Sequence, residues 1–270
     1  FLDRNKDLYG PDIVSDYAID FIQRNKEKPF FLYYPMLLAH DPFVPTPDSD
    51  EWNNPDLRYK KNNIFFKDMV EYMDKIVGKI IQEIKAQGLE DNTLIIFLGD
   101  NGTNRTLVTK TVNGDVKGAK GNTITHGVHV PMIASWPNKI KKPIIYDGVV
   151  DLTDFYATFS DILNVSNDSD GKSLAHIFYG NKKNIRETVT IYYDPKWSIY
   201  VDRYRNIFSQ DKRYKLYKNG EFFDMENDIL EEKPLKEKDL SENEKLIKEK
   251  LLKELSKFPS LPIQSHNESE

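Results

Sequence analysis

The apolar residues of this chain recur at spacings that are typical of amphipathic helices. The most regular stripe has steps of three and four residues and consists of Phe65, Phe66, Met69, Val70, Met73, Ile76, Val77, Ile80, Ile81 and Ile84. Charged residues occupy the opposite face, so the stripe predicts a helix, and Gly88 is a natural stop for it. The same spacing predicts an earlier helix that opens at Gly10-Pro11 and two later ones, over residues 154–163 and 242–255.

Short apolar runs without polar alternation predict strands that are buried on both faces of a sheet. Residues 29–34 and 94–98 are two such runs, and residues 128–136 form a third. The first run leads into a proline-rich loop that contains His40, and the second ends in Gly-Asp-Asn-Gly at residues 99–102. The order of helix, strand, loop, helix and strand is typical of a parallel α/β layout, in which ligands bind at the carboxyl ends of strands.

Asp100 and Asn101 follow a predicted strand directly, and two interpretations of them are open. Asp-Asn-Gly is a common turn sequence. Adjacent carboxylate and amide oxygens also suit a hard cation such as Ca²⁺ or Mg²⁺. His40 is equally open, because a histidine in a loop is either a solvated structural residue or, beyond a buried strand, a functional group.

The last hundred residues change in character. Short alternating segments and a hairpin signal at Asn219-Gly220 predict a small antiparallel sheet, with strands near residues 188–193, 198–201, 205–208, 214–217 and 221–223. We therefore predict an α/β domain over residues 1–165, a small α+β subdomain over 166–258 and a flexible tail over 259–270.

Composition excludes several classes of function. The chain has 270 residues, of which 39% are hydrophobic and 30% charged, enough apolar material for one large core. A net charge of −5 argues against nucleic acid and membrane surfaces as partners, and no apolar run is long enough for a transmembrane helix. Without cysteine, the chain has no disulfide, no thiolate metal site and no cysteine nucleophile of its own.

Several segments in a fixed order together resemble the sulfatase family of the alkaline-phosphatase-like superfamily. They are residues 29–34 with 39–40, 70–74, 91–102, Lys-Gly-Asn-Thr at 120–123, 127–131, 151–158, 170–174, 213–218 and 223–228. The resemblance implies an α/β fold, with a partial alkaline-phosphatase-like sheet flanked by helices and a small C-terminal antiparallel sheet with a helix.

The resemblance also assigns roles to residues of this chain. Asp100 and Asn101 match two ligands of the family's divalent cation, usually Ca²⁺, with Mg²⁺ as the alternative. Lys120 matches the lysine that contacts the substrate's sulfate, and His40 matches a histidine that touches the sulfate ester and can protonate the leaving oxygen. His126 and His129 stand where many sulfatases have Gly and Arg. Each could contact the substrate or be a structural histidine at a strand edge.

One expected feature is missing from the sequence. The family's nucleophile is a formylglycine made from Cys or Ser in a Cys/Ser-x-Pro-x-Arg motif, and this chain has no such motif. The resemblance therefore covers only the C-terminal part of a sulfatase, whose substrate would be a small-molecule or saccharide sulfate ester. We expect the chain alone to be inactive, the missing N-terminal segment to be a partner, and the location to be periplasmic or extracellular. A phosphodiesterase or phosphonate hydrolase of the superfamily, or a non-catalytic sulfatase-like fragment, are the alternatives.

Overall fold

The computed structural model describes residues 8–112, 114–181, 183–194 and 206–258. These residues form two compact units. The first contains the chain up to Phe97, with Asn104–Lys117 and Ile133–Asn138, and the second contains Leu98–Thr103, Gly118–Met132 and the chain from Lys139 onward. The boundary at residue 165 and the tail at 259–270 stay predictions, and the tail lies outside the described residues.

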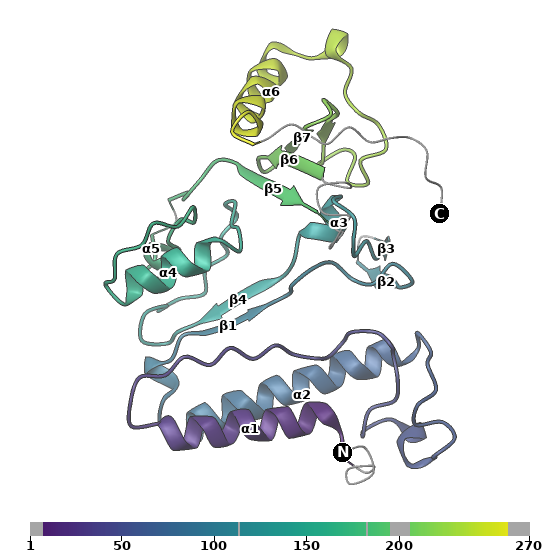
Figure 1. Ribbon diagram of the computed structural model, residues 1–270, viewed down its shortest axis with the longest axis vertical. Coiled ribbons are helices and arrows are strands. Elements are labelled where there is room, and N and C mark those ends of the chain that lie inside the picture. The colour runs from purple at the N-terminus through teal and green to yellow at the C-terminus, as the bar shows by residue number, and fades with distance from the viewer. Residues whose placement is uncertain (1–7, 113, 182, 195–205, 259–270) are drawn as a thin grey trace. The chain divides into compact units, whose positions relative to one another are not determined.

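Two long helices, α1 (Gly10–Asn25) and α2 (Phe65–Ala86), lie side by side in the first unit (Figure 1). The hydroxyl of Tyr72 donates to the carboxylate of Asp12 at 2.8 Å, and the amide of Gln23 donates to Glu83 at 3.0 Å. The later contact lies nearer the C-terminus of both helices, so α1 and α2 run parallel. The predicted stripe of α2 supplies much of the core, which consists of Leu38, Phe43, Phe65, Met69, Tyr72, Ile76 and Leu107.

The strand predicted over residues 29–34 is wrong, because this segment has no ladder in the described chain. The segment precedes α2 as an extended chain whose side chains alternate in exposure. Phe31 and Tyr33 are 70% and 77% exposed, whereas Leu32 between them is half-buried. An apolar run becomes a doubly buried strand only if neighbouring strands cover both faces, and the described residues do not supply them here.

The strand that ends at the Gly-Asp-Asn-Gly turn is present, although its surroundings differ from the prediction. β1 (Ile95–Leu98) is half-buried and pairs with β4 (Met132–Ser135) in a two-stranded sheet. The Gly99 N–H donates to the Pro131 carbonyl at 3.0 Å, so the end of β1 meets the start of β4 and the two strands run antiparallel. Within the described residues, the expected parallel layout is therefore absent.

The polar stretch after Asn101 contains a short hairpin. Its strands, β2 (Val108–Thr111) and β3 (Gly114–Lys117), are antiparallel. The predicted strand over residues 128–136 is shortened at its start by a single helical turn, α3 (Thr125–Val128).

The predicted small antiparallel sheet with a helix is confirmed in the second unit. β5 (Val189–Tyr193), β6 (Asn206–Gln210), β7 (Tyr214–Tyr217) and β8 (Phe222–Asp224) pair in that order, each antiparallel to the next. The predicted strand over residues 198–201 lies outside the described residues. Helix α6 (Glu242–Leu255) packs on this sheet through a core of Ile207, Tyr214, Leu216, Phe222, Leu240, Leu251 and Leu255 (Figure 1).

The remaining helices are short. They are α4 (Asp154–Ile162), α5 (Ala175–Phe178) and the 3₁₀ turns η2 (Asp50–Asn53), η3 (Glu90–Asn92) and η5 (Glu237–Asp239). Helix α4 confirms the helix predicted over residues 154–163. None of the helices in the described ranges has the length and apolar content to cross a membrane.

Candidate functional site

Asp100 and Asn101 lie on the turn that immediately follows β1, as the sequence predicts. Asp100 is exposed and Asn101 is half-buried. The Asn101 amide nitrogen donates to Oδ1 of Asp100, so the two side chains lie against each other. The Gly102 N–H donates to the Gly127 carbonyl at 2.9 Å, which ties this turn to the segment before β4.

Two glycines allow close approaches between backbones in this region. A Cβ atom on Gly102 would lie 2.0 Å from the carbonyl oxygen of His126, and one on Gly127 would lie 2.2 Å from that of Asn122. Neither distance is possible for a real side chain. The contact between the turn that carries Asp100 and the backbone of His126 therefore requires glycine at residue 102, and the contact between residue 127 and the Asn122 backbone requires glycine at residue 127.

Lys120 belongs to the same cluster of loops. The Lys120 N–H donates to the carbonyl of Thr103, two residues beyond Asn101, at 2.9 Å. Lys120 is half-buried. Gly121 adopts a φ of +84°, a left-handed conformation that favours glycine and turns the chain beyond Lys120. The structure thus brings the backbone of Lys120 next to the turn of Asp100 and Asn101.

The two histidines of this region differ in their surroundings. His126, in α3, is half-buried, and its Nδ1 atom is buried without a hydrogen-bond partner among the described residues. His129 is exposed, and its N–H donates to the Thr125 carbonyl at 2.9 Å. The alternative of a hydrogen-bonding histidine at a strand edge does not describe His126, which lies in a helical turn. Its contact with a substrate stays a prediction.

His40 belongs to the first unit, whereas the other predicted site residues belong to the second. Its side chain is 62% exposed, and Nδ1 lies 2.6 Å from the Asp41 carbonyl oxygen. Oδ1 of Asp41 accepts a hydrogen bond of 3.2 Å from Asn104, which connects the loop to the stretch that follows Thr103. The action of His40 together with Lys120 stays a prediction.

The second unit contains a buried polar network that the sequence did not predict. Nζ of Lys215 donates to the Thr123 carbonyl and to Glu231, each at 2.6 Å. The side chains of Lys215 and Glu231 are 0% and 2% exposed. Burial lowers the pKa of Lys215, and the attraction of Glu231 opposes that shift. A lysine between Tyr214 and Leu216 in an alternating segment suggests a solvent-facing position, so the local pattern gave no signal of this network.

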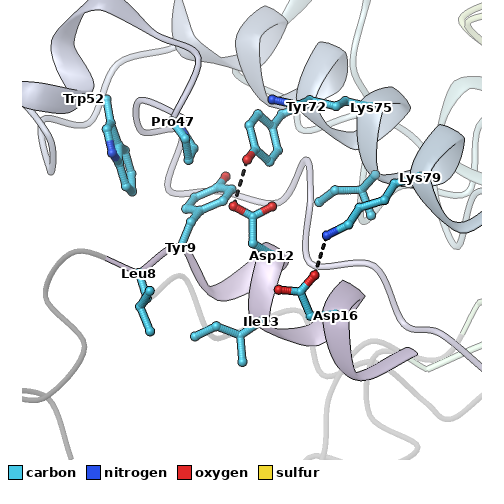
Figure 2. Close-up of a pocket in the computed structure, with 11 residues that line it drawn as sticks. Leu8, Tyr9, Asp12, Ile13, Asp16, Pro47, Trp52, Tyr72, Lys75 and Lys79 are labelled. Atoms are coloured by element: carbon cyan, nitrogen blue, oxygen red, sulfur yellow. Dashed lines mark hydrogen bonds and ion pairs between the residues drawn. The ribbon is translucent and has the colours of Figure 1, made fainter. Parts of the chain in front are cut away.

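The structure also has a pocket of about 640 Å³ in the first unit, between α1, α2 and the loop near Pro47 (Figure 2). The Tyr9 ring packs edge-on against Trp52 and Tyr72, with centroid distances of 5.3 and 5.1 Å. Burial raises the pKa of the Tyr9 and Tyr72 hydroxyls above the usual range of tyrosine. Asp12 already accepts the Tyr72 hydroxyl, and none of the predicted site residues lines this pocket.

A hard cation would find part of a coordination shell at the end of β1. The carboxylate of Asp100 and the amide oxygen of Asn101 are the ligand types that Ca²⁺ and Mg²⁺ prefer, but these cations take about six to eight ligands. The described residues contain no group of three or more His, Cys, Asp or Glu side chains arranged to hold a metal ion. The two residues therefore fit such a cation as a partial donor set.

Comparison with known proteins decides the family. The sulfatase family model matches residues 5–165, more than half of the chain. The chain belongs to the sulfatase family. A second model, of the C-terminal region of N-sulphoglucosamine sulphohydrolase, matches residues 122–259.

Individual proteins that this sulfatase chain resembles are sulfatases too. It is 32% identical over 163 residues to an uncharacterized sulfatase, YdeN, from Escherichia coli, covering 58% of this chain and 28% of the relative. It is 29% identical over 168 residues to an N-acetylgalactosamine-6-O-sulfatase from Bacteroides thetaiotaomicron, covering 58% and 31%. The crystal structure of Ps i-CgsB in complex with k-i-k-neocarrahexaose superposes with a TM-score of 0.69 at 25% identity, covering 92% of this chain and 54% of that one.

The predicted α/β sulfatase fold is confirmed. The chain spans less than a third of either relative's length and about half of that solved structure.

Proposed function

We propose that this chain contributes the sulfate-binding side of a site that hydrolyses sulfate esters of carbohydrates. The observation that carries the proposal is the backbone contact between Lys120 and Thr103. It places residues 120–123, the lysine segment, beside the turn of Asp100 and Asn101. Both belong to one compact unit of a sulfatase-family chain.

The residue types suit the chemistry of a sulfate ester. The ester carries negative charge, and more charge develops on the bridging oxygen as the S–O bond breaks. The Lys120 ammonium would stabilise this charge, and His40 would deliver the proton that an alcohol leaving group needs. A divalent cation held by Asp100 and Asn101, Ca²⁺ or Mg²⁺, would add charge stabilisation at the sulfate oxygens. His126, whose buried Nδ1 atom has no hydrogen-bond partner in the part of the chain that the structure describes, is a further candidate contact for the substrate.

The nucleophile is proposed from the family alone. We propose a formylglycine, carried on a part of the gene product that this sequence does not contain. The names of the relatives support a saccharide sulfate as substrate, since one is an N-acetylgalactosamine-6-O-sulfatase and a solved neighbour is in complex with a hexaose. A periplasmic or extracellular location belongs to the same proposal.

The role of Lys120 can be tested in the complete gene product with aryl and sugar sulfates as substrates. We expect Lys120→Ala to lower kcat/KM by about 10²–10³, because removing one group that stabilises transition-state charge typically costs this much. Lys117→Ala is the matched control, an exposed lysine in β3 three residues earlier, and should leave kcat/KM unchanged. Equal activity of the two variants would refute the role of Lys120.

The same assay separates the alternatives. Hydrolysis of phosphodiesters or phosphonates in place of sulfate esters would favour phosphorus chemistry within the superfamily. A complete gene product that turns over neither kind of ester would favour a non-catalytic protein.

A further inference from the structure

The C-terminal sheet holds the segment that carries Lys120. The Tyr193 hydroxyl, from β5, donates to the Gly121 carbonyl at 3.2 Å. The Thr123 hydroxyl lies 3.1 Å from that of Tyr217, in β7, and accepts a hydrogen bond of 3.2 Å from Asn206, in β6. Three strands of one sheet therefore contact two residues that lie within three positions of Lys120.

The centre of these contacts is the buried ammonium of Lys215. It donates to the Thr123 carbonyl and to Glu231, and lies 4.3 Å from the centre of the Phe208 ring. The Tyr217 hydroxyl donates to the second carboxylate oxygen of Glu231, so both oxygens of that carboxylate are bonded. Of these two acceptors of Lys215, the Thr123 carbonyl belongs to the lysine segment.

Stability alone does not account for an ion pair at this position. Burying two charges costs a desolvation penalty, and replacing a buried ion pair with apolar residues of similar volume is often neutral or stabilising. A lysine here gives something that an apolar side chain cannot, namely a donor that fixes one backbone carbonyl in place.

We infer that Lys215 is a positioning residue for Lys120. Through its bond to the Thr123 carbonyl, supported by Glu231 and Tyr217, it fixes the Lys-Gly-Asn-Thr segment so that the Lys120 ammonium meets the substrate's sulfate. The role given to Lys120 rests on the proposed function, whereas the anchoring of the segment does not.

The test compares variants of the complete gene product by two measurements. The double variant Lys215→Met/Glu231→Leu removes both charges together, so that no unpaired buried charge is left. Lys218→Met is the matched control, because Lys218 also donates to backbone carbonyls, those of Leu255 at 2.7 Å and Phe258 at 3.0 Å, away from the lysine segment. Amide hydrogen exchange reports on the segment at residues 119–127, and steady-state kinetics with a sulfate ester separates KM from kcat.

We expect the double variant to remain folded and to exchange amide hydrogens in the segment at least about tenfold faster than wild type. Its KM should rise about tenfold with a smaller change in kcat, because loss of ground-state contact with the sulfate weakens binding. Tyr217→Phe, which removes only a hydroxyl, should raise the exchange rate and KM by less than the double variant does. It replaces the double variant in the test if that variant does not fold. Lys218→Met should leave both quantities at the wild-type value.

Wild-type exchange in the segment for Tyr217→Phe and for every folded Lys215 variant would overturn the anchoring. Faster exchange with a wild-type KM would overturn the positioning of Lys120. If the wild-type gene product hydrolyses no sulfate ester but the variants still exchange faster, the proposed function fails while the anchoring is supported.

Discussion

At the residue scale, the site depends on a position that has no side chain. The Gly102 backbone lies so close to His126 that an added Cβ would be 2.0 Å from the carbonyl oxygen. Because the clash is with backbone, a change of rotamer cannot relieve it. The turn of Asp100 and Asn101 would have to move away from α3.

We predict that Gly102→Ala destabilises the fold by about 1–3 kcal/mol, the usual cost of overpacking. Gly78→Ala is the matched control, since Gly78 lies within α2 with nothing inside 4 Å of an added Cβ. That change should stabilise the protein by about 0.5–1 kcal/mol, the helix preference of alanine over glycine. Urea unfolding of both variants measures the difference, and equal effects of the two would contradict the close approach.

Asp100 and Asn101 could be located from the sequence because their signal is local. An apolar run followed by Gly-Asp-Asn-Gly predicts a strand and a turn, and both are found. Lys120 was singled out only through family resemblance. Lys215 and Glu231 were missed, because the partner that gives Lys215 a role, Thr123, is 92 residues away in the chain.

At the element scale, the spacing of apolar residues predicted the helices more accurately than the strands. The stripe from Phe65 to Ile84 predicts α2 well, since a spacing of three and four residues depends only on the helix itself. The run at residues 29–34 predicted a strand that the described chain does not form. An apolar run indicates that a segment is packed against other parts of the protein. It does not show whether those parts are strands that could pair with it.

The β7–β8 hairpin provides a test that depends on pH. Arg213 donates to both carboxylate oxygens of Asp224, at 2.9 and 2.6 Å, and these hydrogen bonds lower the pKa of Asp224. A carboxylate with a lowered folded pKa contributes stability above its unfolded pKa of about 3.9 and loses it as pH falls through the folded value.

Asp224→Asn should therefore lower Tm at pH 7 by about 2–4 °C, and the difference from wild type should shrink as pH falls below about 4. Glu226→Gln is the control, because Glu226 pairs with the same arginine at 3.0 Å but its side chain is 66% exposed. It should change Tm clearly less at every pH. A difference between Asp224→Asn and wild type that stays constant with pH in calorimetric scans would contradict this assignment.

At the scale of the whole molecule, the predicted site residues are divided between two compact units. His40 belongs to the first, and Asp100, Asn101, Lys120 and His126 belong to the second. The family, the α/β class and the C-terminal sheet could be predicted from the sequence, because ordered motifs extend from residue 29 to residue 228. The grouping of residues 98–103 and 118–132 with the C-terminal sheet could not, since it depends on contacts between distant segments.

We predict that the 270-residue chain by itself has little sulfatase turnover, because its sequence contains no Cys/Ser-x-Pro-x-Arg motif. We also expect weak Ca²⁺ binding, with Kd in the millimolar range or above, since Asp100 and Asn101 supply only part of a shell of about six to eight ligands. Calorimetric titration and a sulfate-ester assay, with the complete gene product as the positive control, check both. Robust turnover or micromolar binding by the chain alone would contradict the partial site.

The distance in sequence between Thr123 and Lys215 also determines when the site can form during synthesis. Lys215 leaves the ribosome 92 residues after Thr123, which takes roughly 5 to 18 seconds at typical rates of translation. For nearly all of that interval, once His126 has followed Thr123, the nascent chain carries every predicted site residue, but its lysine segment has no sheet to hold it. A chain that is released early would therefore have the full set of these residues without the fixed geometry that they need.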